Sequence, residues 1–117
     1  MRRLLLLAAW LPAGALAQGQ SCIPAATLAN FSECMQAEIL PLEAKVVHLS
    51  NAVRAKLKPA PQKLRAFDRA QDGWNAYRNG ECEMEAHRQP EGLDAKRAFA
   101  QCTKRLLEAR AKELEAL

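Results

Sequence analysis

The segment "CEMEAHRQPEGLDAKRAFAQC", residues 82–102, carries one cysteine at each end of a predicted turn. Its centre, "QPEG" at residues 89–92, has the proline and glycine that favour a turn, and helix-favouring residues flank it. In an antiparallel helix pair, residues equally far from the turn lie at the same height. Because the turn lies midway between Cys82 and Cys102, the spacing favours two paired helices joined by a Cys82–Cys102 disulfide.

The helices on either side of this turn are predicted from residues that recur three or four positions apart. The first runs from about Gln62 to about Arg88, and the second is predicted to begin with Asp94 as its N-cap. The face of the first helix is predicted to contain Leu64, Phe67, Gln71, Trp74, Tyr77, Arg78, Glu81 and Cys82. The apolar face of the second is predicted to contain Ala95, Phe99, Cys102, Leu106, Ala109 and Leu114.

An earlier helix is predicted to follow an N-cap at Thr27 and to end at "KPAPQ", residues 58–62. Pro41 lies inside it and removes one helical hydrogen bond, so a kink or a break near Ile39 is expected. Because the apolar pattern continues in phase through Pro41, one long bent helix is favoured over two. The residues of this pattern are Leu28, Phe31, Met35, Ile39, Leu42, Val46, Leu49, Val53 and Leu57.

These patterns predict an all-α fold, a small antiparallel bundle of three long helices with the first kinked or split at Pro41. Four cysteines in an exported chain favour two disulfides, which leaves Cys22 and Cys34 as the second pair. In one continuous helix these two would lie about 18 Å apart, so Cys22 must lie outside the helix if they are bonded. Other pairings, such as Cys34 with Cys82, remain open.

The N-terminal residues have the pattern of a secretory signal peptide. Two arginines precede the apolar block "LLLLAAWLP", and the small residues Ala15 and Ala17 favour cleavage after Ala17. We therefore expect a signal peptide at residues 1–17, a single helical domain at 18–117, and a periplasmic or secreted protein without stable membrane insertion after cleavage. Cleavage lowers the formal charge from +4 to +2, with both signs mixed, which does not indicate nucleic-acid binding.

The remaining polar residues do not form a recognisable catalytic or metal-binding pattern. His48 and His87 have no spacing that joins them to each other or to a free cysteine, and the acids at 81, 83 and 85 point in different directions on a helix. We therefore predict no catalytic residue, no metal and no cofactor. Tyr77 and Arg78 can belong either to the scaffold or to a contact patch for a partner, and both interpretations remain open.

The arrangement of these residues resembles the LprI-type lysozyme inhibitor N-terminal domain, a family of small exported bacterial proteins. The resemblance is carried by "AQDGWNAYRNGEC" at residues 70–82 and "CTKRLLEARAKEL" at 102–114, and it covers nearly the whole mature chain. It implies a helical protein that binds a protein partner, with lysozyme as the partner that the family name indicates. The turn "RQPEGLDAK", residues 88–96, departs from the Gly-Gly-Ser type segment that family members often carry.

The sequence and the resemblance together predict a binding protein rather than an enzyme. The leading hypothesis is inhibition of lysozyme, with Tyr77, Arg78, Gln89 and Glu91 as candidate contacts. The alternative is an envelope structural or adaptor module whose protein partner is not lysozyme. Lysozymes of the c type are strongly basic, so a net charge of +2 gives no electrostatic attraction unless the acids gather locally.

Overall fold

A computed structural model describes Cys22 and residues 28–117, and the described part of the chain consists of three helices without a strand. Helix α1 spans Leu28–Leu57, α2 spans Pro61–His87 and α3 spans Leu93–Glu115. The predicted all-α class and the number of helices are confirmed. The predicted signal peptide and the Thr27 N-cap lie outside the described residues. None of these three helices has the length of uninterrupted apolar sequence that a bilayer span requires.

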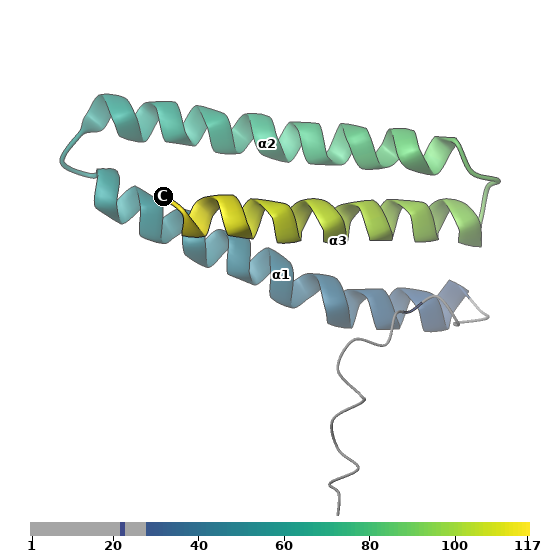
Figure 1. Cartoon of the computed structure of the whole chain (residues 1–117). Coiled ribbons are helices and arrows are strands. Elements are labelled where there is room, and N and C mark those ends of the chain that lie inside the picture. The colour runs from purple at the N-terminus through teal and green to yellow at the C-terminus, as the bar shows by residue number, and fades with distance from the viewer. Residues whose placement is uncertain (1–21, 23–27) are drawn as a thin grey trace, which may run out of the picture.

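Helix α3 occupies the middle of the bundle. In Figure 1, α2 and α3 run antiparallel along their whole lengths, while α1 lies on the opposite side of α3 and crosses it obliquely. Both outer helices pack extensively on α3, whereas α1 and α2 contact each other much less. The bundle is therefore two helix pairs that share one central helix, and a space is left between the outer two.

Helix α1 continues without interruption through Pro41. Its axis bends partway along, as expected where a proline removes a hydrogen bond (Figure 1). One bent helix, as the in-phase apolar pattern favoured, is therefore confirmed. The predicted inward face is also confirmed for every residue whose side chain is described: Phe31, Met35, Val46 and Val53 are buried, and Ile39, Leu42, Leu49 and Leu57 are half-buried.

The predicted face of the last helix was wrong at several positions. Phe99 and Ala109 are exposed, and Ala95 and Leu106 are only half-buried. The reason is that α3 packs against a helix on each side, so it buries a wide face instead of one stripe. Of the predicted residues only Cys102 and Leu114 are buried. The buried residues of α3 are Ala100, Cys102, Thr103, Leu107, Ala111 and Leu114.

The start of α3 also differs from the prediction. The helix begins at Leu93, so Asp94 lies in its first turn and is not the N-cap. The N-cap is Gly92, whose φ of 97° lies in a region that residues with a Cβ rarely adopt. Asp94 instead lies 3.7 Å from the guanidinium of Arg97, and its negative charge suits the first turn of a helix.

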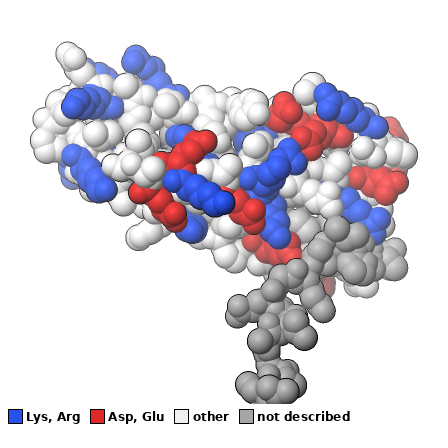
Figure 2. Space-filling view, viewed as in Figure 1, with Lys and Arg blue, Asp and Glu red and all other residues white. Residues whose placement is uncertain are grey.

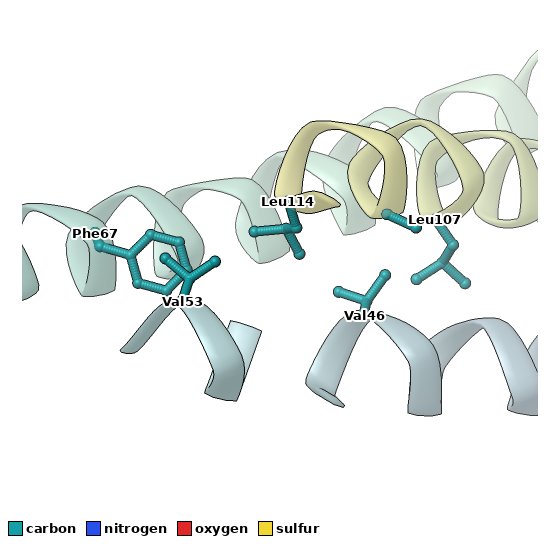
Figure 3. Packing of buried hydrophobic residues seen from close by; sticks show 6 residues of the cluster. Val46, Val53, Phe67, Leu107 and Leu114 are labelled. Carbon is teal, nitrogen blue, oxygen red and sulfur yellow. The ribbon is translucent and has the colours of Figure 1, made fainter. Parts of the chain in front are cut away.

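The hydrophobic core lies where all three helices meet. Val53 of α1 packs beside Phe67 of α2 and Leu114 of α3, and Val46 faces Leu107 (Figure 3). A second, smaller cluster lies near the beginning of α1 and contains Cys22, Phe31, Met35 and Ala100. Each cluster contains one buried phenylalanine, Phe67 in the first and Phe31 in the second, and most of the other buried members are aliphatic side chains.

Both favoured disulfides are confirmed. Cys82 and Cys102 join α2 to α3 with 5.4 Å between their Cα atoms, and both residues are completely buried. Cys22 and Cys34 join the segment before α1 to its second turn, with 5.8 Å between their Cα atoms. One disulfide therefore fixes the central helix pair near its turn, and the other attaches the N-terminal segment to the small cluster.

Replacing Cys82 and Cys102 together by alanine should lower the free energy of unfolding by about 3 kcal/mol, because the bridge closes a loop of 20 residues in the unfolded chain. Urea denaturation of the double variant and of the unchanged protein measures the difference. Treatment of the double variant with reductant should give a further decrease from the Cys22–Cys34 bridge. An unchanged midpoint in the double variant would contradict this role.

The glycines of α2 and the glycine before α3 should respond to alanine in opposite directions. Gly73 and Gly80 lie within a helix, and a Cβ added to either meets no atom within 4 Å. Each substitution to alanine should therefore raise the free energy of unfolding by about 0.5–1 kcal/mol. Gly92→Ala is the matched control and should lower it, because alanine is strained at a φ of 97°. Thermal melts of the three variants test these signs.

Candidate functional site

Between the outer helices lies a cavity of about 370 Å³, which we call the α1–α2 groove. It exists because α1 and α2 both rest on α3 and touch each other little. Leu107 of α3 lies at its base. Its polar lining comes from Glu43, Ser50, Asn51 and Arg54 of α1 and from Gln71, Asn75 and Arg78 of α2, with the indole of Trp74 beside them.

Trp74 is the centre of a group of stacked cations. The guanidinium carbon of Arg78 lies 5.2 Å from the centroid of its ring, and that of Arg110 lies 5.7 Å away. Contacts of this kind contribute about 0.5–1 kcal/mol at partly exposed sites. Arg110 also pairs with Glu113 at 2.8 Å, whereas Arg78 forms no ion pair with any acid in residues 28–117. The Arg78 charge is held in position by the indole without being neutralised.

Gln71 is buried and its orientation is fixed by Arg110. Nε and Nη2 of Arg110 both donate to the same side-chain atom of Gln71, at 3.1 and 2.9 Å. A guanidinium can only donate, so the accepting atom must be the amide oxygen. The amide nitrogen of Gln71 is therefore left as a donor beside the groove.

Ser50 is a buried polar residue without a hydrogen bond. Only 4% of it is exposed, and its Oγ has no partner among the described residues. Buried hydroxyls normally form at least one hydrogen bond, because an unpaired one costs roughly 1–3 kcal/mol. Ser50 lines the groove, and its unpaired hydroxyl is buried in the wall of that groove.

One ion pair crosses between the outer helices near the turn that joins them. Arg54 Nε of α1 lies 2.6 Å from Asp68 Oδ1 of α2, and Arg54 also donates to Asn51 Oδ1 at 3.4 Å. The positive charge of Arg54 is therefore balanced within the protein. Its contact with Asn51 leaves the amide nitrogen of Asn51 as a further donor.

The four predicted partner contacts are not brought together in one place. Arg78 lines the α1–α2 groove, while Tyr77 does not and is 55% exposed. Successive residues of a helix differ in direction by about 100°, so these neighbours lie on different sides of α2. Gln89 and Glu91 are exposed in the turn after α2. Their role in binding a partner stays a prediction.

An exposed apolar residue on α2 was missed in the sequence. Met84 is 46% exposed. Tyr77, Glu81, Met84 and Arg88 follow one another along α2 and its end at steps of four, three and four residues. This spacing places the four residues on one side of the helix. We call them the Tyr77 strip. It leads towards the turn that contains Gln89, and its spacing was visible in the sequence.

The charges separate towards the two ends of the bundle. Residues 51–70, around the α1–α2 turn, contain six Lys or Arg and one Asp, and Figure 2 shows only basic side chains at that end. Residues 79–95, around the α2–α3 turn, contain five acids and one Arg. Two of these acids, Glu85 and Asp94, pair with Arg105 and Arg97, and Figure 2 shows side chains of both signs at this end. Glu81, Glu83 and Glu91 are left without an ion pair in the described chain, at the end to which the Tyr77 strip leads.

Within the described part of the chain, one group of residues has the geometry of a metal site. It consists of Cys22, Cys34 and Glu38. The two sulfur atoms are joined in a disulfide and so offer no thiolate, which is the form that binds metals. Glu38 pairs with Lys104 at 3.2 Å. These residues are explained by the bundle without a metal.

Comparison with known proteins identifies one family. The family described as "Lysozyme inhibitor LprI" matches residues 21–114, which include all four cysteines and all but the last residue of α3. No curated protein sequence and no solved structure matches the chain.

Ser50→Ala should raise the free energy of unfolding by about 1 kcal/mol, because it removes a buried hydroxyl that has no partner. Thr103→Val is the matched control, since the Thr103 hydroxyl donates to the Phe99 carbonyl at 2.9 Å. That variant should be less stable than the unchanged protein by a similar amount. Urea denaturation measures the free energy of unfolding of both variants. If Ser50→Ala lowers it as much as Thr103→Val does, the Ser50 hydroxyl forms a hydrogen bond and the prediction is wrong.

Proposed function

The chain belongs to the LprI family of lysozyme inhibitors, and on this premise we propose that it binds lysozyme and inhibits it by covering its substrate cleft. The observation that carries the proposal is the extent of the match. Because residues 21–114 include the helices and both disulfides, the proposal concerns the whole bundle and not a short motif.

The proposed contact surface is the Tyr77 strip together with the turn at Gln89 and Glu91. Tyrosine, methionine and arginine are enriched in protein interfaces, and Tyr77 and Met84 are among the most exposed large apolar side chains. A rigid helix presents them with little loss of conformational entropy on binding. Tyr77 is therefore proposed as the central contact, with the turn as a second contact at the end of the strip.

The local charge supports this choice of surface. Glu81 lies within the strip, and Glu83 and Glu91 are exposed near it. An acidic surface increases the rate at which a basic protein such as a c-type lysozyme associates. The basic residues around the α1–α2 turn lie at the other end of the bundle and would be directed away from such a partner.

We also propose that the protein acts outside the cytoplasm, in the periplasm or in the medium. Two disulfides form and persist in oxidising compartments, in agreement with the signal peptide expected at residues 1–17. No catalytic step is assigned to it. The alternative function, an envelope adaptor with another protein partner, is favoured by the exposed basic end, which a lysozyme inhibitor of this design does not use.

Purified protein at micromolar concentration should slow the lysis of bacterial cell walls by lysozyme. Tyr77→Ala combined with Met84→Ala should weaken inhibition by about tenfold or more, since two exposed interface anchors are lost. Leu40→Ala is the control, because Leu40 on α1 is 58% exposed and lies away from the strip. Turbidity of a cell-wall suspension measures the rate.

Undiminished lysis in the presence of the unchanged protein would overturn the inhibitor function. If the double variant and the Leu40 variant inhibit lysozyme equally well, the inhibitor function stands but the proposed contact surface is wrong. Recovery of envelope proteins other than lysozyme on the immobilised protein, together with undiminished lysis, would favour the adaptor.

A further inference from the structure

The structure assigns a second binding site to the α1–α2 groove, for a small compound that carries both a carboxylate and an ammonium group, such as an amino acid or a short peptide. This site is separate from the proposed lysozyme-binding surface, because the groove lies on the side of α2 that faces α1 while the Tyr77 strip does not line it. It does not depend on whether the protein inhibits lysozyme.

The carboxylate is expected at Arg78. Its guanidinium is stacked 5.2 Å from the Trp74 ring centroid, is half-buried, and is not paired with an acid in the described chain. A planar guanidinium in a fixed orientation can form two parallel hydrogen bonds to a carboxylate. Arg54 is already balanced by Asp68, so the groove offers one uncompensated positive charge. One such charge suits a carboxylate better than a doubly charged phosphate.

Neutral donors line the same groove. The amide nitrogens of Gln71 and Asn51 remain available, because their oxygens accept from Arg110 and Arg54 respectively. The hydroxyl of Ser50 is buried, lines the groove and has no partner in the described chain. A ligand with carboxylate or amide oxygens would supply the acceptors that these three groups lack.

The ammonium group is expected at Glu43, the only carboxylate that lines the groove. The Arg54–Asp68 ion pair sets which residues of the antiparallel helices α1 and α2 face each other. Glu43 of α1 and Arg78 of α2 both line the groove, and they come from the two different outer helices. The two side chains nevertheless form no ion pair, so the opposite charges stand on opposite walls with the cavity between them.

The size and rigidity of the groove fit such a ligand. Its volume of about 370 Å³ is at the lower end of the range of small-molecule sites. Its walls belong to long helices that both pack on α3, which fixes the backbone on either side of the groove. A preformed site of this kind binds without the cost of ordering a loop.

Trp74 provides a direct measurement. It is the only tryptophan in residues 18–117, so tryptophan emission excited without exciting Tyr77 reports on the groove. We expect alanyl-alanine and alanine to change the emission saturably. Acetate, which lacks the ammonium group, and ethylammonium, which lacks the carboxylate, should bind at least about tenfold more weakly, since each leaves one wall charge unpaired.

Arg78→Gln and Glu43→Gln should each weaken alanyl-alanine binding by about tenfold, the former through loss of the carboxylate contact and the latter through loss of the ammonium contact. Arg65→Gln, an exposed residue outside the groove, is the matched control and should bind as the unchanged protein does. Thermal melts verify that each variant is folded. The absence of a saturable response to alanyl-alanine, or equal binding of acetate and alanine, would overturn the site whatever the lysis assay shows.

Discussion

The packing of α3 against both outer helices is the constraint on which the rest of the structure depends. Because α1 and α2 contact each other much less, α3 provides most of the surface that holds the three helices together. The core contains Leu107 and Ala111 of α3 together with Phe67, and the Cys82–Cys102 bridge adds a covalent link in the first half of α3. The same arrangement keeps the outer helices apart and so creates the groove between them.

Patterns that belong to a single helix were predictable from the sequence. The inward face of α1 followed from spacing alone, because α1 packs on one side only. The disulfide between Cys82 and Cys102 followed from symmetry about the turn, which is also a local property. The face of α3 was not predictable in this way, since a helix between two neighbours buries residues such as Ala100 and Thr103 that lie off a single stripe.

The candidate sites depend on relations between helices, and this limited what the sequence could indicate. Tyr77 and Arg78 were considered together because they are adjacent, yet one is exposed on the flank of α2 and the other faces α1 across a cavity. Nothing in the sequence places Glu43 and Arg78 in one groove, because the groove is formed by two helices that both rest on α3. The unpaired hydroxyl of Ser50 likewise becomes apparent only when its surroundings are known.

The uneven distribution of charge along the bundle determines the electrostatic field that an approaching partner experiences. A helix of 27 residues is about 40 Å long, whereas ionic screening at physiological salt reduces electrostatic interactions within about 8 Å. An approaching molecule therefore senses mainly the charges of the end that it meets, which are basic at the α1–α2 turn and mixed at the α2–α3 turn. In dilute buffer the screening length grows several-fold, the two fields overlap, and the molecule behaves as one long dipole that rotates to align with its target.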